Sequence, residues 1–340
     1  MENKKVLVTG GAGFIGGNFV QYMVDKYPDY DIYNLDLLTY AGDLTKHRSI
    51  EKKENYHFIK ADIADRNTIM ELFEKEQFDF VVHFAAESHV DRSITNPEIF
   101  VITNVLGTQV LLDAAKEHKI TKFVHVSTDE VYGELDFDPE TFFTEETPLQ
   151  PNSPYSASKA SSDMLVRAYY ETYKLPINIT RCSNNYGPYH FPEKLIPLTI
   201  SRVINDQRVP IYGDGKNIRD WLHVIDHCSA IDLVLHKGQL GEVYNVGGHN
   251  EQTNLEVVKT IIGTLGKSED LIEFVGDRLG HDKRYAIDPT KLELLGWKPQ
   301  YNFDTGIRHT IQWYLDNYDW LKQIISGKYQ MYFEDQYGMK

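Results

Sequence analysis

The sequence is short of several features that would mark particular classes of protein. Only two cysteines occur among its 340 residues, Cys182 and Cys228, and their spacing fits neither a disulfide framework nor a metal site. No apolar run approaches the roughly 18–20 residues that cross a membrane, and the N-terminus lacks the apolar region of a signal peptide. We therefore expect a cytoplasmic globular protein without a bound metal.

Positive charge is also scarce. Lysine and arginine number 35 against 50 aspartates and glutamates, which gives a formal net charge of −15. Such a charge repels the phosphates of nucleic acids and anionic membrane surfaces, so we expect neither as a partner. An anionic ligand would need a local cluster of cations.

Short apolar runs alternate with longer amphipathic segments in the first half of the chain, among them KVLVTG, DIYNLD, FDFVVHFAA and KFVHVST. This alternation is typical of βαβ units and predicts an α/β fold, a Rossmann-type doubly wound parallel sheet, over residues 1–185. The looser pattern of residues 186–340 predicts a smaller mixed α/β domain. Within it, Trp221–Val224 and Glu242–Val246 are expected to return to the main sheet.

A glycine-rich loop follows the first of these runs. The stretch VLVTGGAGFIG places Gly10, Gly13 and Gly16 between a strand and a helical pattern, which is the context of a dinucleotide-binding loop. Glycines there let the backbone approach a pyrophosphate at the helix N-terminus. Asp36 ends the second strand, where a carboxylate accepts the ribose 2′-hydroxyl and repels a 2′-phosphate. The pattern predicts NAD rather than NADP as cofactor.

Tyr155 and Lys159 are four residues apart in a helical pattern that runs from Pro154 to about Lys174, so both project from one helical face. A tyrosine titrates at about 10 and is a poor base at neutral pH unless a cation stabilises its phenolate. Lys159 can supply that cation. The alternative is an exposed pair on a surface helix.

Two adjacent acids, Asp129 and Glu130, end the apolar run KFVHVST. Such a pair commonly lies in a solvated turn or caps a helix. The carboxyl ends of parallel strands are, however, where ligands bind in these sheets, which places the two acids among the candidate catalytic groups.

Together, TGGAGFIG, Asp36 and YSASK resemble the extended short-chain dehydrogenase/reductase family over nearly the whole chain. The resemblance implies that Tyr155 takes a proton from a sugar hydroxyl, while Lys159 also holds the nicotinamide ribose. It matches Thr128 to the family's strand-end hydroxyl, which would hydrogen-bond the C4 oxygen. Within the family, Thr128-Asp129-Glu130 is similar to nucleotide-sugar 4,6-dehydratases, since 4-epimerases carry small or hydroxyl residues at the two acidic positions.

A 4,6-dehydratase oxidises C4 of the sugar, eliminates water across C5 and C6, and reduces C6. We assign Glu130 as the base at C5 and Asp129 as the acid for the C6 oxygen, which requires their pKa values to be pushed apart. A UDP-hexose 4-epimerase, a dehydratase of another nucleotide sugar and a noncatalytic NAD-binding regulator remain alternatives.

The resemblance also implies binding residues along most of the chain. Gly17, where serine or another residue is frequent in the family, is expected only to cost some helix propensity. The expected NAD-binding residues are Gly10, Gly13, Phe14, Ile15, Gly16, Asp36, Thr39, Asp62, Ile63, Phe84, Ala85, Ala86, Thr103, Tyr155, Lys159 and Asn185. For a dTDP-sugar substrate they are Glu87, Ser88, Thr128, Asn184, Lys194, Leu195, Pro210, Tyr212, Arg219, Asn254, Asp277, Arg278 and His281.

The resemblance further implies a homodimer and a pathway. Asn96–His118 and Pro154–Lys174 would each contribute a helix to a four-helix bundle between two copies. The pathway would be deoxysugar biosynthesis of the dTDP-rhamnose type, leading to cell-surface polysaccharide.

Overall fold

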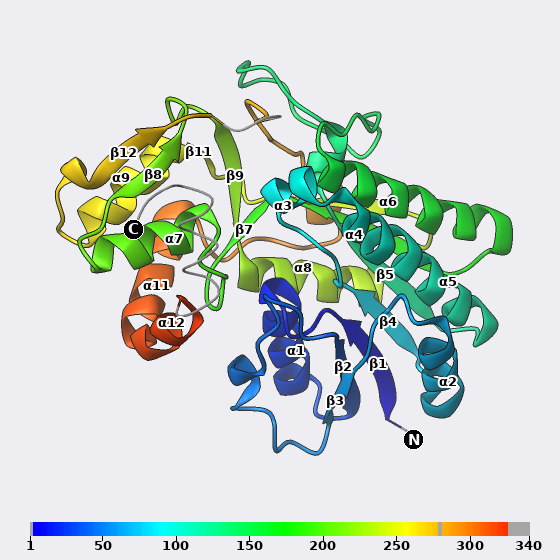
Figure 1. The fold of residues 1–340 in the computed structure, drawn as a ribbon. Coiled ribbons are helices and arrows are strands. Elements are labelled where there is room, and N and C mark those ends of the chain that lie inside the picture. Colours follow the sequence, from blue (N-terminus) through cyan, green and yellow to red (C-terminus); the bar gives the residue numbers. More distant parts are fainter. Residues whose placement is uncertain (1–2, 278–280, 326–340) are drawn as a thin grey trace.

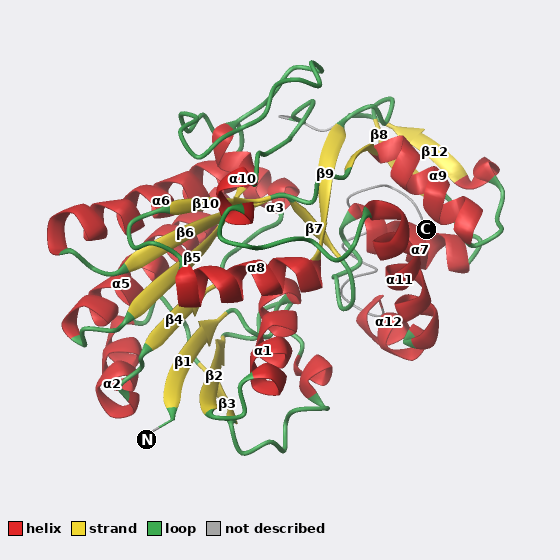
Figure 2. Ribbon diagram, turned by 180° about the vertical axis from the view of Figure 1, so that it is seen from behind, coloured by secondary structure: helices red, strands yellow, loops and turns green. Residues whose placement is uncertain are grey.

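A parallel sheet of seven strands organises the larger part of the molecule (Figures 1 and 2). This computed structural model describes residues 3–277 and 281–325. The strand order β10-β6-β5-β4-β1-β2-β3 reverses between β1 and β4, and ligands bind at such switch points, beyond the carboxyl ends of the strands. The strands are β1 (Lys4–Thr9), β2 (Tyr30–Asp36), β3 (Tyr56–Lys60), β4 (Phe80–His83), β5 (Lys122–Thr128), β6 (Ile177–Cys182) and β10 (Val243–Val246).

Helices cover both faces of this sheet, because successive side chains of a strand point to opposite sides. Val6 and Val8 of β1 belong to the core formed with α1 and α8, whereas Leu7 belongs to the core formed with α2, α5 and α6. Burial on both faces explains the unbroken apolar runs in the sequence, and the predicted Rossmann-type α/β fold is confirmed. The helices are α1 (Phe14–Lys26), α2 (Arg66–Glu76), α5 (Thr108–Glu117), α6 (Pro154–Tyr173) and α8 (Val224–Lys237).

The smaller part of the molecule lies beyond the carboxyl ends of the strands, on the left in Figure 1. Two small sheets, ordered β11-β9-β7 and β12-β8, lie there with four helices. Its strands are β7 (Asn184–Tyr186), β8 (Val209–Tyr212), β9 (Ile218–His223), β11 (Glu251–Thr253) and β12 (Ile272–Val275). Its helices are α7 (Leu195–Ile204), α9 (Asn254–Thr264), α11 (Phe303–Asp316) and α12 (Tyr318–Ile325). A short helix, α10 (Thr290–Glu293), packs beside β10.

Only one of the two segments expected in the main sheet lies there. Val243–Val246 forms β10, which pairs with β6 at the sheet edge. The expectation for Trp221–Val224 was wrong, because β9 pairs with β7 and β11 in the small sheet instead. With β10 already beside β6, the edge of the main sheet has no place for β9.

The segment Asn96–His118, expected to be one helix, contains a π-helical turn. The short helices α3 (Val90–Thr95) and α4 (Pro97–Phe100) lead into the π turn η2 (Val101–Gly107), and α5 continues from it. By length and composition alone Pro97–Glu117 could cross a membrane, the one such helix among the described residues. Half of its apolar window is buried, and it packs against α6, which is the position of a core helix.

Candidate active site

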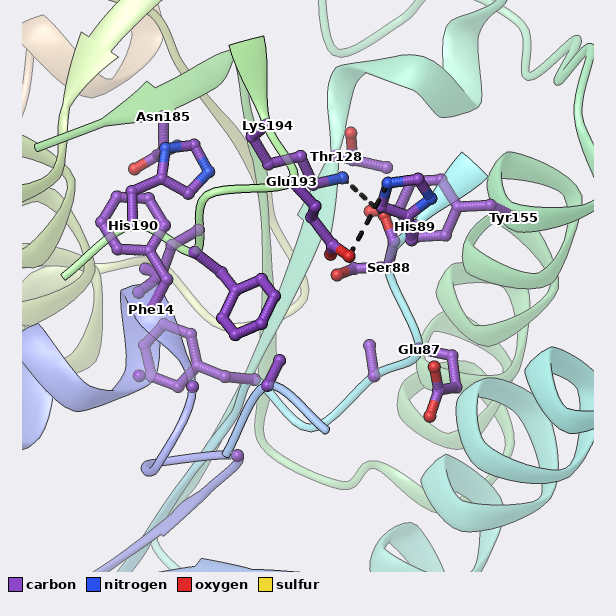
Figure 3. A pocket seen from close by; sticks show the side chains of 18 of the residues that line it. Phe14, Glu87, Ser88, His89, Thr128, Tyr155, Asn185, His190, Glu193 and Lys194 are labelled. Carbon is purple, nitrogen blue, oxygen red and sulfur yellow. Dashed lines mark hydrogen bonds and ion pairs between the residues drawn. The ribbon is translucent and has the colours of Figure 1, made fainter. Parts of the chain in front are cut away.

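A cleft of about 500 Å³ opens where the main sheet meets the smaller part of the molecule (Figure 3). The segments that follow β1 to β6 all line it, because the carboxyl ends of parallel strands meet at one edge. Segments of α7, β8 and β9 supply the opposite wall. Every predicted site residue in the described part of the chain lines this cleft except Asp277, which instead contacts His281 through an Nδ1–Oδ1 distance of 2.6 Å. Arg278 lies outside the described residues.

The glycine loop is shaped for close approach. Gly10 has a φ of +72°, and a Cβ there would lie 2.6 Å from the backbone nitrogen of Ala85, so no larger residue fits. At Gly13, the N-cap of α1, no side chain caps the helix, and its first turn carries no acid. The N–H groups of this turn are therefore available to an anion.

Asp36 ends β2 at the wall of the same cleft. Its Oδ2 accepts a hydrogen bond from the Ala12 N–H at 2.9 Å, and its Oδ1 accepts one from the Leu38 N–H at 2.7 Å. The backbone thus fixes the carboxylate beside the glycine loop, where it can accept a hydrogen bond from a ribose hydroxyl.

The two adjacent acids lie in a 3₁₀ turn, η3 (Asp129–Tyr132), directly after β5. The Thr128 hydroxyl accepts a hydrogen bond from the Glu130 N–H and donates one to Asp129 Oδ1, both at 3.3 Å. Asp129 is only 2% exposed, and its Oδ2 has no hydrogen-bond partner. Burial, with the nearby charges of Glu130 and Asp220, raises the pKa of Asp129 well above its ordinary value, against the opposing effect of Arg219. The raised pKa of Asp129 favours its protonated form, and because the side chain is buried the solvated-turn alternative is wrong for it.

Tyr155 and Lys159 lie in the first two turns of α6, whose start is fixed by a capping box between Ser153 and Ser156. Both side chains are buried, so the surface-pair alternative is wrong. The Lys159 ammonium donates to the carbonyl oxygen of Val126 at 2.8 Å, and burial lowers the pKa of Lys159 to about 8.

The tyrosine is a neutral hydroxyl in this structure. Burial, with the charge of Glu130, raises the pKa of Tyr155 well above its ordinary value and outweighs the hydrogen bond with Thr128 that lowers it. The sequence-based expectation of a cation-stabilised phenolate is therefore not met in this state, because burial is the larger effect.

Cations line the part of the cleft nearest the smaller sheets. Lys194 donates to the carbonyl oxygen of Ser88 at 3.2 Å (Figure 3). Arg219 is 5% exposed, donates to the carbonyl oxygen of Asp282 at 2.9 Å and stacks on the Tyr285 ring. These side chains place local positive charge in an acidic protein, as an anionic ligand requires.

Some residues that line the cleft, or that bond to a residue lining it, were not predicted from the sequence. Figure 3 shows Glu193 reaching toward His89, and the structure adds Tyr40 and Arg92 as partners of the same buried carboxylate. Asn104, in the π turn, exchanges hydrogen bonds with the backbone N–H and C=O after β4. Neither pattern could be read locally, because the partners lie far apart in sequence.

The fold and the site define a class of protein. A dinucleotide loop after β1, an acid at the end of β2 and a Tyr/Lys pair at the start of the helix before β6 identify an extended short-chain dehydrogenase/reductase.

Comparison with known proteins narrows this class. A family model described as GDP-mannose 4,6 dehydratase matches residues 7–310, and the chain belongs to this family. The dTDP-glucose 4,6-dehydratase of Xanthomonas campestris pv. campestris (strain B100) is 52% identical, over 96% of this chain and 97% of that protein.

Two solved structures are similar over 94% of this chain and 99% of theirs. One is the dTDP-glucose 4,6-dehydratase of Bacillus anthracis str. Ames in complex with NAD, with a TM-score of 0.88 and 52% identity. The other is DesIV, a dTDP-glucose 4,6-dehydratase of Streptomyces venezuelae with NAD and TYD bound, with a TM-score of 0.90 and 46% identity.

Proposed function

We propose that this protein converts dTDP-glucose into dTDP-4-keto-6-deoxyglucose, using NAD. The observation that carries the proposal is the buried Asp129, whose pKa is raised, beside Glu130 in the same cleft as Tyr155 and Lys159. Such a set contains one more acid–base pair than hydride transfer alone requires. The similarity to several dTDP-glucose 4,6-dehydratases over nearly the full chain supports the same substrate.

The cleft fits NAD by its shape and its donor groups. Gly10 allows close approach of the backbone, the first turn of α1 offers free N–H groups, and Asp36 accepts a ribose hydroxyl. When bound, NAD takes a hydride from the sugar and later returns it. We place NAD against residues 1–185, and the sugar nucleotide mainly against residues 186–340.

The residues at the end of β5 and the start of α6 handle the protons of the first step. Tyr155 first gives its own hydroxyl proton to solvent and then receives the proton of the C4 hydroxyl, while Thr128 hydrogen-bonds the same oxygen. The hydrogen bond with Thr128 lowers the pKa of Tyr155 against burial. A protonated Lys159 on the same helical face would act in the same direction, by stabilising the phenolate.

The two acids then carry the elimination. Glu130 removes the C5 proton, which the C4 ketone has acidified. Asp129 donates its proton to the C6 oxygen as the C6–O bond breaks, so that one water leaves. Glu130 returns a proton to C5 when C6 is reduced, and Asp129 regains its proton from solvent.

A product assay separates the candidate functions. The purified protein is incubated with dTDP-glucose and, as a matched control, with UDP-glucose, and products are followed by mass spectrometry. We expect loss of one water from dTDP-glucose. A 4-epimerase would leave the mass unchanged, a regulator would give no product, and preference for UDP-glucose would make the thymidine assignment wrong.

A homodimer is part of the proposal. The exposed large apolar side chains on η2 and α6 include Val101, Leu106 and Met164, which are 56%, 46% and 59% exposed. The two helices are neighbours in the fold, so these side chains offer an apolar surface that a second copy can cover in a four-helix bundle. Met164→Glu should yield a monomer in light scattering, and an unchanged dimer would place the interface elsewhere.

We also propose a pathway and a location for the reaction. A 4-keto-6-deoxy nucleotide sugar made in the cytoplasm would serve biosynthesis of the dTDP-rhamnose type and cell-surface polysaccharide. Disruption of the gene should remove 6-deoxysugars from that polysaccharide, as sugar analysis would measure.

A further inference from the structure

Lys46 is a buried cation at the glycine loop that the proposed mechanism does not use. It lies in the 3₁₀ turn η1 (Leu44–His47), is 3% exposed and lines the cleft. Its Nζ donates to the carbonyl oxygen of Gly13 at 2.7 Å. The same oxygen accepts a hydrogen bond from the Gly17 N–H, which places the ammonium group beside the first turn of α1.

Three other basic side chains in the cleft are bonded elsewhere. Lys159 donates to β5, Lys194 to the segment after β4, and Arg219 to a backbone carbonyl beyond β12. Lys46 is therefore the lysine that brings positive charge to the loop expected to hold the cofactor's diphosphate.

Within residues 3–277 and 281–325, Lys46 forms no ion pair with a carboxylate, and its ammonium group donates to a backbone carbonyl instead. The two nearest carboxylates have other partners: Asp36 accepts from the Ala12 and Leu38 N–H groups, and Asp43 accepts from Thr45 and from the Trp320 indole.

Burial therefore dominates the electrostatics at this lysine. It lowers the pKa of Lys46 to about 8, and the charges of Asp43 and Asp36 oppose the shift only in part. The other groups that face it are His47 and His190, whose pKa values burial lowers, and the Tyr189 ring at 6.0 Å. A cation beside the positive end of a helix is unfavourable unless an anion lies between them.

We propose that Lys46 binds the diphosphate of the cofactor, and that Gly17 leaves free the space that the Lys46 side chain occupies. A Cβ at position 17 would lie 2.5 Å from Lys46 Cδ, so a side chain there displaces the lysine stem. The expectation that Gly17 only costs helix propensity was therefore incomplete, because it missed this contact. The inference rests on the proposed use of NAD.

The first test measures the dissociation constants of NAD, ADP-ribose and adenosine for cofactor-free protein by calorimetry. Lys46→Met should weaken NAD and ADP-ribose at least about tenfold, as loss of a charge-assisted hydrogen bond does. Adenosine, which has no phosphate, should bind equally to both proteins. Lys53→Met, at an exposed lysine paired with Asp25, is the matched control and should change none of these constants.

The pH dependence separates a charge effect from a structural one. Wild-type affinity for NAD should fall as the pH rises above about 8, because Lys46 then loses its proton. The ratio of wild-type to Lys46→Met affinity should shrink over the same range. A ratio that stays constant with pH, or equal weakening of adenosine, would overturn the proposal in favour of a structural role.

A double-mutant cycle tests Gly17. Gly17→Ala should weaken NAD binding in the wild type but cause little further loss in a Lys46→Ala background. Additive losses would show that Gly17 acts independently of the lysine. If the wild type binds NAD and converts dTDP-glucose while Lys46→Met binds NAD normally, this inference alone fails; if the wild type does not bind NAD, the proposed function fails.

Discussion

Replacing Asp129 with asparagine should separate the two halves of the reaction. The variant keeps the shape of a side chain that is 2% exposed, but it cannot give a proton to the C6 oxygen. General acid catalysis contributes typically about 10²–10⁴-fold, which corresponds to about 3 to 5 kcal/mol of barrier at about 1.4 kcal/mol per tenfold. We therefore expect elimination to slow by that factor while oxidation at C4 proceeds.

Single-turnover absorbance of the reduced nicotinamide measures both steps. In Asp129→Asn the reduced cofactor should form at the wild-type rate and then persist, because the next step is blocked. Elimination at the wild-type rate in this variant, together with unchanged oxidation at C4, would refute the assignment of Asp129 as the acid. Slow formation of the reduced cofactor would instead show that Asp129 acts in the first step.

The remaining predictions concern the cofactor loop, the acid limit of stability and the first proton transfer. Gly10→Ala should abolish NAD binding, because its positive φ and the backbone of Ala85 exclude a Cβ; calorimetry with NAD checks this, and normal affinity would contradict it. Asp163 is buried, which alone would raise its pKa, but hydrogen bonding and the Arg181 charge lower that pKa to about 2. Its ionised form therefore stabilises the fold above about pH 4 by about 2 kcal/mol, and this contribution is lost as the pH falls toward 2. Urea unfolding should show a weaker dependence on pH over that range for Asp163→Asn, and an unchanged dependence would count against the ion pair. Thr128→Val should slow C4 oxidation about 10- to 100-fold in single-turnover absorbance, whereas a wild-type rate would remove its role at the C4 oxygen.

Local sequence patterns were sufficient to predict the main sheet, the glycine loop and the Tyr155/Lys159 pair. Apolar runs identify strands buried on both faces, and the glycine loop and the Tyr155/Lys159 spacing each need only one segment. The carboxyl ends of parallel strands share an edge, so the sequence alone was enough to place Asp36 and Asp129 in one cleft.

Contacts between distant segments could not be predicted in this way. The strand that includes Trp221 does not join the main sheet, because β10 occupies the edge beside β6. That arrangement depends on strand pairing across the whole fold. The π turn at Asn104, the clustering of charges around Glu193 and the fit of Lys46 over Gly17 are tertiary contacts with no local signal. Burial also raises the pKa of Tyr155, whereas the sequence led us to expect a phenolate stabilised by Lys159. The burial of this side chain could not be judged from the helix alone.

Turnover of dTDP-glucose in deuterated water tests the central claim most directly. Removal and return of the C5 proton by Glu130 exchanges that position with solvent, so the product should have lost one water and carry deuterium at C5. NMR locates the label, and Glu130→Gln should prevent its incorporation. A product of unchanged mass without deuterium at C5 would contradict the account, because only transfer of hydride at C4 would then have occurred.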